Sequence, residues 1–431
     1  MKSAFFIPSN RDSTESVGSY MAELRFAKDQ MNRDVPMVVS ETSDGPHVSV
    51  NARALARAAK ANPDLEFLHL TVDVQREYFT RLFEGEDPKV AEQFFSKEKN
   101  YGTAMNKLFL ATCSLQAQAL HRRDSDTTLL SDHLESVTTG PPIEVELSHL
   151  GRTVGQVAPT GDTKVDDREL WVVGGNYFGE WNLDVKDFAR RSFDIVHRLY
   201  EILGFDKEAV EEICAEAFQF DPVYEDIDEV TPITSVNDGL NPDAGNVAIY
   251  RLHELLPAVP GRNMLAADYF QFDIATVLGI PSLHHTRPVF HRYNSSRFDL
   301  EQKSVYWEGM ARFADYFNFF GDLFNQGLQV ESTSADPMPA EAVEQIIADI
   351  RARRARPGDE RVYRIEQLAR EILLPFDERY ARIGRHLVSQ ADRIVTECDE
   401  DYRRYEDLLL RWPTLVERAK NIDLRALMGM T

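Results

Sequence analysis

Short apolar runs and amphipathic stretches alternate along the N-terminal part of the chain. Continuous apolar runs at 4–8, 36–41 and 65–72 are typical of strands buried on both faces of a parallel sheet. The stretches 15–32 and 50–62 between them place apolar residues at helical spacing. Strand alternating with helix in this way predicts a βαβ sheet.

The stretch 101–120 predicts a helix that leads into a fourth strand, which ends at His121. Asp124 and Asp126 then follow just beyond the carboxyl end of that strand. Ligands of open α/β sheets bind at this edge, so the two carboxylates are candidates for a binding site.

The pattern becomes less regular in the middle of the chain. The stretch 168–203 predicts a strand, a glycine turn, an acidic aromatic loop and an amphipathic helix. Many turn formers and an acidic run at 221–246 indicate a loop or lid. The stretch 267–294 predicts a helix, then Gly279 and a basic tail that carries histidines.

From about residue 300 the pattern is almost entirely helical. The aromatic stretch 304–326 is expected to form core or interface, and 335–431 predicts charged amphipathic helices that form an exposed bundle or a homodimer arm. We therefore expect an α/β fold with a sheet flanked by helices, in three parts at 1–130, 131–300 and 301–431, of which the last is a helical extension.

Composition narrows the function classes. The 431 residues are 43% hydrophobic and 28% charged, as in an ordinary globular protein. A formal charge of -23 argues against nucleic-acid binding, which needs a concentrated basic face. Three widely spaced cysteines indicate buried thiols in a reducing compartment rather than a zinc site. No signal peptide or apolar span is recognisable, so a cytoplasmic protein without a membrane partner is expected.

Asp124 and Asp126 are the first candidates for chemistry. Two carboxylates at i and i+2 can hold one hard divalent ion, Mn²⁺ or Mg²⁺, which neutralises a diphosphate. The alternative is a solvated charged turn. Among the histidines 284, 285 and 291, we expect His285 or His291 to join the metal, since imidazole is a competent ligand.

Asp268 and Asp273 are candidates for a catalytic base. Asp268 can take a proton from a hydroxyl group, with Asp273 one turn on as the spare candidate. The alternative role of Asp268 is that of a cap at a helix start. In "GEWNLD", Trp181 offers an aromatic face to a ligand or fills the core.

Several motifs, in order, resemble those of GT-A-type glycosyltransferases. "FFIPSNRDS" resembles the first strand and its nucleotide loop, "NYGTAMNKLFLATC" the helix before the D-x-D motif, and "LHRRDSD" the D-x-D itself. Further on, "WVVGGNYFGEWNLDVKDF" resembles the strand and glycine-rich loop of the donor and acceptor pocket. "AADYFQFDIATVLGIPSLHHTRPVFH" resembles the acidic helix start and the later metal-binding histidine.

The resemblance implies a GT-A-like mixed sheet, with a nucleotide-binding half at 1–130 and a donor/acceptor half at 131–300. It also implies a metal-dependent transfer of sugar from a nucleotide-diphosphate sugar to an acceptor, here expected to be a small molecule or peptide. In such a transfer, Asp268 would take the proton of the acceptor hydroxyl and Trp181 would face a sugar ring. The implied donor-binding residues are Pro8, Ser9, Asn10, Arg11, Asn106, Arg123, Gly174, Gly175 and Trp181. The implied metal ligands are Asp124, Asp126, His285 and His291, and the implied catalytic residues are Asp268 and Asp273.

Two positions depart from the pattern of this family. Arg122 and Arg123 interrupt the apolar strand before the D-x-D, where they are either solvent-exposed or in contact with phosphates. The acidic helix start has Ala-Asp in place of Glu-Asp, which leaves one carboxylate there.

Three other functions stay open. "DSDTT" also matches the nucleophile motif of haloacid-dehalogenase-like phosphatases, with Asp124 phosphorylated, although that motif belongs near the start of its fold. A nucleotidyltransferase would need a glycine-rich basic loop after the first strand, and 8–16 contains no glycine. A non-catalytic binding or assembly protein on the same scaffold is the third alternative.

Overall fold

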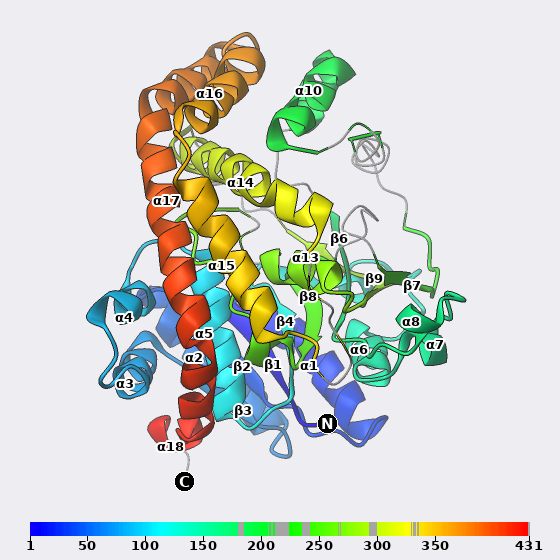
Figure 1. The fold of residues 1–431 in the computed structure, drawn as a ribbon. Helices are drawn as coiled ribbons and strands as arrows, with labels where there is room; N and C mark the ends of the chain where they lie inside the picture. Colours follow the sequence, from blue (N-terminus) through cyan, green and yellow to red (C-terminus); the bar gives the residue numbers. More distant parts are fainter. Residues whose placement is uncertain are drawn as a thin grey trace.

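A mixed β-sheet forms the centre of the protein, as the computed structural model shows (Figure 1). The model describes residues 1–179, 185–205, 207, 210–211, 224–234, 242–265, 267, 269–292, 300–328, 330, 333 and 336–429. Within these ranges the strand order is β3-β2-β1-β4-β8-β6-β9-β5, with β7 also paired to β9. The strands are β1 Ser3–Ser9, β2 Met37–Glu41, β3 Phe67–Leu70, β4 Ala119–Arg123, β5 Thr127–Leu129, β6 Val172–Gly179, β7 Val230–Ile233, β8 Asn246–Tyr250 and β9 Ser282–His291.

Strands β1 to β4 run parallel, as the βαβ pattern predicts. β1 and β2 are buried almost throughout, which explains their continuous apolar runs. β8 runs antiparallel between β4 and β6, and β6 is parallel to β9. The carboxyl ends of β1, β2 and β4 therefore lie along one edge of the sheet.

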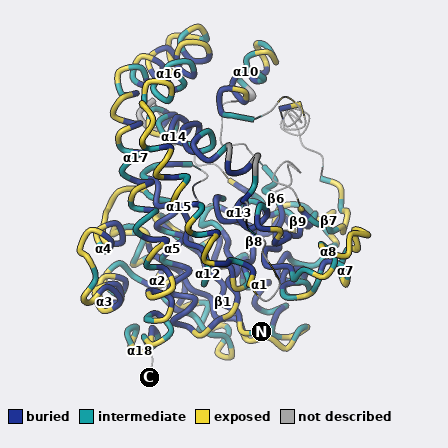
Figure 2. The backbone as a smooth tube through the Cα atoms, viewed as in Figure 1, coloured by how far each residue is buried: buried dark blue, intermediate teal, exposed yellow. Residues whose placement is uncertain are grey.

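Helices cover the sheet and the dark core in Figure 2 lies between the layers. Those of the N-terminal part are α1 Thr14–Asp29, α2 Pro46–Ala61, α3 Val72–Leu82, α4 Pro88–Phe95 and α5 Tyr101–Ser114. After β5 come the short η1 Leu130–Asp132, then α6 Pro142–His149, α7 Val154–Val157, α8 Thr163–Asp166, α9 Val185–Arg191, α10 Phe193–Leu203, α12 Leu252–Leu255 and α13 Phe270–Val277.

The C-terminal part is helical, as predicted. It contains α14 Leu300–Gln326, α15 Ala340–Arg354, α16 Asp359–Gln367, the π-helical η4 Leu368–Leu373, α17 Glu378–Lys420 and α18 Leu424–Leu427. The 43-residue α17 runs along α14, α15 and α5, and its apolar face is part of the main core (Figure 1). The α/β architecture with a helical extension is thus confirmed.

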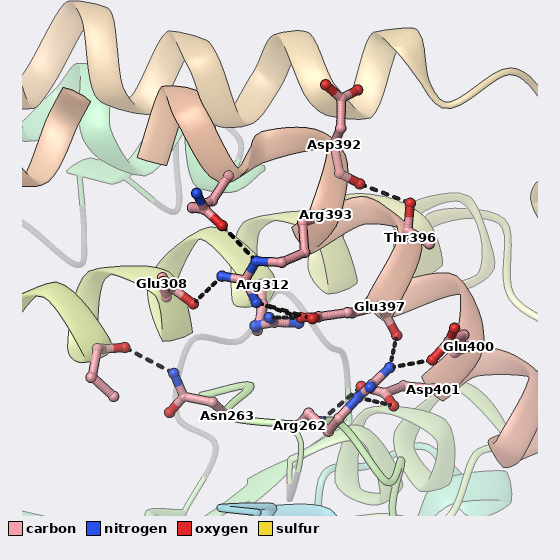
Figure 3. Close-up of polar contacts among 12 residues, drawn as sticks. Arg262, Asn263, Glu308, Arg312, Asp392, Arg393, Thr396, Glu397, Glu400 and Asp401 are labelled. Carbon is pink, nitrogen blue, oxygen red and sulfur yellow. Dashed lines mark hydrogen bonds and ion pairs between the residues drawn. The ribbon is translucent and has the colours of Figure 1, made fainter. Parts of the chain in front are cut away.

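An ionic network joins the segment before α13 to the C-terminal helices (Figure 3). The Arg262 guanidinium bonds the Asp401 carboxylate at 3.0 Å and Glu400 at 2.9 Å. Arg393 of α17 reaches Glu308 of α14 at 3.0 Å. Burial raises the pKa of Asp401 to about 6 although Arg262 opposes the shift. These contacts hold the sheet and the helical extension together.

Three local predictions were wrong. Gly174 and Gly175 lie inside β6 instead of forming a turn, because neighbouring groups leave no room for a side chain. A Cβ at Gly174 would meet the Asn246 carbonyl oxygen at 2.4 Å, and one at Gly175 would meet the His285 ring at 2.6 Å. The histidine-bearing tail after Gly279 is the long strand β9, and β4 extends beyond His121 to Arg123.

A buried ion cluster lies beneath the end of β4. The Arg123 guanidinium binds both carboxylate oxygens of Glu23 on α1, at 2.9 and 3.0 Å, and Glu146 on α6 at 2.9 Å. His121 contacts the second Glu146 oxygen at 2.6 Å, and all four side chains are fully buried. Burial opposes ionisation of Glu146, but Arg123 and His121 outweigh it and lower its pKa to about 2. Burial raises the pKa of Glu23 despite Arg123.

Arg123→Met should lower the free energy of unfolding by about 3–5 kcal/mol, because it leaves two buried carboxylates without their cation. Urea denaturation followed by circular dichroism measures this. Arg25→Met is the matched control, since Arg25 forms a solvent-accessible pair with Asp64 and its loss should change stability little. Equal effects of the two substitutions would contradict a structural role for Arg123.

Candidate functional site

The turn between β4 and β5 carries Asp124 and Asp126. The Thr127 hydroxyl donates to the Asp124 carbonyl oxygen at 2.8 Å, and the Ser16 hydroxyl donates to the Ser125 carbonyl oxygen at 2.9 Å. These bonds fix the turn to itself and to α1. The Asp124 and Asp126 side chains stay 25% and 12% exposed, so both carboxylates can be reached from solvent.

Asp126 is the meeting point of three chain segments. The Arg11 guanidinium, from the loop after β1, bonds Asp126 Oδ2 at 2.7 Å. His291 Nε2, at the end of β9, lies 3.6 Å from the same oxygen. The structure therefore brings together one of the predicted donor-binding residues and two of the predicted metal ligands.

Asp124 is held by two donors. The Arg122 guanidinium bonds Asp124 Oδ1 at 3.0 Å, and the Tyr177 hydroxyl donates to Oδ2 at 2.7 Å. Burial, together with Asp124 and Asp243, raises the pKa of Tyr177 well above its usual value, so its phenol stays a donor. The ring of Tyr177 stacks on that of His291, with centroids 4.9 Å apart.

Gly245 makes the contact between Asp124 and Tyr177 possible. A Cβ at this position would lie 2.2 Å from the Tyr177 hydroxyl oxygen and 2.5 Å from the Asp124 carboxylate carbon. The absence of a side chain thus opens the space in which the two groups bond.

Asp243 adds a third carboxylate beside this group. Its oxygens accept the Tyr177 backbone N–H at 2.6 Å and the Tyr269 hydroxyl at 2.9 Å. Burial raises the pKa of Asp243 to about 6; Asp124 adds to the shift, whereas the two donors and His291 oppose it. The sequence analysis missed Tyr177, Asp243 and Gly245, since nothing local distinguishes them from other residues of acidic and glycine-containing loops.

The loop after β1 is fixed by side-chain bonds. Pro8 pairs with Ser40 of β2, and the buried Ser13 hydroxyl donates to that of Ser9 at 2.6 Å. Asn51 donates from its amide to the Arg11 carbonyl oxygen at 3.0 Å and to Glu41 at 3.0 Å. Asn10, by contrast, is exposed. The loop is therefore a rigid rim beside Asp126.

Other predicted residues lie away from the carboxylates. Arg123 belongs to the buried ion cluster, so its predicted phosphate contact is corrected to a structural role. Asn106 is buried and exchanges hydrogen bonds with the backbone of Ala258, at 2.7 and 2.8 Å, which is also a structural role. Gly174 and Gly175 serve the close packing of β6 against its neighbours.

The two histidines proposed as alternative metal ligands, His285 and His291, lie six residues apart on β9. His285 is fully buried against Gly175, and burial lowers its pKa to about 3. Because a strand rises about 3.3 Å per residue, His285 and His291 cannot both reach one ion. The prediction of His285 as a ligand is therefore corrected, and His291 is the histidine beside Asp126.

Of the two predicted bases, Asp273 lies in the described part of the chain, where it is buried on α13. Asp268 lies outside the described residues, as does Trp181. Within the described ranges, no three histidine, cysteine or carboxylate side chains converge as a preformed metal site. Nor does any helix in the described part of the chain have the length and apolarity needed to cross a membrane.

Fold and site together define an α/β protein that presents carboxylates at the carboxyl edge of a mixed sheet. The chain belongs to the family of unknown function DUF6271, which matches residues 2–428. No curated protein matches it.

Three solved structures are similar to the chain. Mannosyl-3-phosphoglycerate synthase from Rubrobacter xylanophilus is 14% identical over 79% of both chains, with a TM-score of 0.35. The mannosyltransferase PcManGT from Pyrobaculum calidifontis, in complex with GDP-Man and Mn²⁺, is 12% identical over 98% of this chain and 87% of its own, with a TM-score of 0.37. TarS 1-349 from S. aureus is 11% identical over 95% of this chain and 92% of its own, with a TM-score of 0.33.

Two of these three structures are named as a mannosyl-3-phosphoglycerate synthase and a mannosyltransferase. Identities of 11–14% and TM-scores below 0.5 do not extend those activities to this chain.

Gly245→Ala should lower the free energy of unfolding by about 1–3 kcal/mol, because the added methyl group overlaps Asp124 and Tyr177. Gly18→Ala is the control: this exposed glycine of α1 has nothing within 4 Å of an added Cβ, and alanine should stabilise the helix by about 0.5–1 kcal/mol. Thermal and urea unfolding measure both. Unchanged stability of Gly245→Ala would contradict the close packing of this site.

Proposed function

We propose that the protein is a glycosyltransferase that moves a sugar from a nucleotide-diphosphate sugar to a small-molecule or peptide acceptor. The observation that carries the proposal is the convergence of Arg11, Asp126 and His291 at the carboxyl edge of the sheet. This edge is where ligands of open α/β sheets bind. The Arg11 guanidinium can bind a diphosphate, and the adjacent Asp126 carboxylate and His291 imidazole can bind the divalent ion that accompanies it.

The donor set is compatible with Mn²⁺ or Mg²⁺. Asp126 Oδ2 supplies a hard oxygen and His291 Nε2 an imidazole nitrogen that faces it at 3.6 Å. Two protein ligands leave the remaining positions to the diphosphate and to water. When bound, the ion would neutralise the charge that develops on the departing nucleoside diphosphate.

The remaining residues have roles that follow from their contacts. Arg11 is 35% exposed and can turn its guanidinium from Asp126 to a phosphate, whose geometry it matches. Pro8, Ser9 and Asn10 form the rim on which the nucleoside would lie. Arg122 and Tyr177 keep Asp124 oriented toward the same space.

The phosphatase alternative fits the fold less well. Asp124 follows the fourth strand along the chain, whereas the phosphatase motif belongs near the start of its fold.

One of GDP-mannose, UDP-glucose and TDP-glucose should raise the Tm of the protein by a few degrees in the presence of Mn²⁺. Ligand at 100 times its Kd stabilises the native state by about 2.7 kcal/mol. Asp126→Asn and His291→Ala should each abolish the Mn²⁺-dependent part of the shift. Thermal unfolding at fixed protein concentration measures it.

Asp64→Asn is the control for these variants, because Asp64 pairs with Arg25 on the surface and outside the site. It should retain the full shift. Absence of a shift with all three nucleotide sugars, or a shift that survives both site substitutions, would contradict the proposal.

A further inference from the structure

Asp243 stands in a turn whose geometry is fixed on both sides. Its backbone N–H donates to the Gly175 carbonyl oxygen at 3.0 Å, and its carbonyl oxygen accepts the Asn246 N–H at 2.8 Å. Asp243 is partly exposed as a residue, and its carboxylate accepts the Tyr177 N–H and the Tyr269 hydroxyl. Each donor leaves lone pairs on its oxygen, so the carboxylate can still accept a proton.

Tyr177 connects Asp243 to the proposed donor site. Its backbone binds Asp243, its hydroxyl binds Asp124, and its ring stacks on His291. Tyr177 thus fixes the position of Asp243 relative to the residues that would hold the diphosphate. Gly245, two positions after Asp243, packs against the same Tyr177 hydroxyl.

We propose that Asp243 is the general base of the transfer and removes the proton from the acceptor hydroxyl as that oxygen attacks the anomeric carbon. This inference rests on the proposed function. The new bond between oxygen and carbon forms as the bond from the anomeric carbon to the diphosphate oxygen breaks, and the electron pair leaves with the nucleoside diphosphate. The proton passes to Asp243 and then to solvent. A single displacement of this kind inverts the anomeric configuration.

The surroundings of Asp243 suit this role. The titratable groups that face it are Tyr177 on β6, Tyr269 before α13, Asp124 after β4 and His291 on β9. Burial, aided by Asp124, raises its pKa to about 6. A carboxylate with this pKa is ionised at neutral pH and binds a proton more strongly than an ordinary aspartate, as a general base requires.

The test uses water as the acceptor and measures hydrolysis of GDP-mannose, UDP-glucose and TDP-glucose with Mn²⁺. For the wild type, kcat/KM should rise with pH through one inflection and then level off, since only ionised Asp243 takes the proton. Asp243→Asn should lower kcat by at least about 100-fold, remove this inflection and leave the nucleotide-sugar shift in Tm unchanged. Proton NMR of the released sugar should show inverted configuration.

Asp226→Asn is the matched control. Asp226 also accepts a tyrosine hydroxyl and backbone N–H groups, from Tyr224, Thr138 and Thr139, but these contacts lower its pKa. This variant should keep the wild-type rate and pH profile. Retained configuration, an active Asp243→Asn with the wild-type profile, or a wild type that binds donors without hydrolysing them would overturn the role of Asp243 while the donor site stands. A protein that binds none of the three donors would overturn both proposals.

Discussion

The buried pairing of Arg123 with Glu23 and Glu146 is the constraint on which the site depends. Arg123 directly precedes Asp124, and its guanidinium ties the end of β4 to α1 and α6. Isolated charges are unfavourable in an interior, so the three groups hold one another in place. The turn that follows begins from a fixed strand end, and in it Asp126 bonds Arg11 of the loop after β1. The two arginines before the D-x-D thus differ: Arg123 supports the strand, whereas Arg122 contacts Asp124.

A second constraint is the close approach of β6, β8 and β9. Gly174, Gly175 and Gly245 let neighbouring groups come nearer than any side chain would allow. At Gly245 this closeness produces the bond between Tyr177 and Asp124, and Tyr177 then reaches Asp243 and His291. The residues that allow the strands to pack closely, such as Gly245, are therefore also the residues that bring the carboxylates together.

The first four strands could be predicted because the local sequence shows that they are buried: they are continuous apolar runs between amphipathic helices. The place of Asp124 and Asp126 at the sheet edge followed from their position directly after the fourth predicted strand. The glycines of β6 suggested a turn, since the need for small residues comes from β8 and β9, which are distant in sequence. His285 and His291 looked equivalent because only the path of β9 separates them. Asp243 stands in an acidic segment with many carboxylates, and only the contacts with Tyr177 and Tyr269 distinguish it.

The central claim is that the edge formed by Arg11, Asp126 and His291 binds a nucleoside diphosphate with a divalent ion. Anomalous diffraction from crystals grown with Mn²⁺ and GDP, UDP or TDP tests it most directly. The account predicts one manganese peak within ligand distance of Asp126 Oδ2 and His291 Nε2, with the diphosphate beside Arg11. Manganese bound at another place, or a nucleotide bound away from this edge, would contradict it.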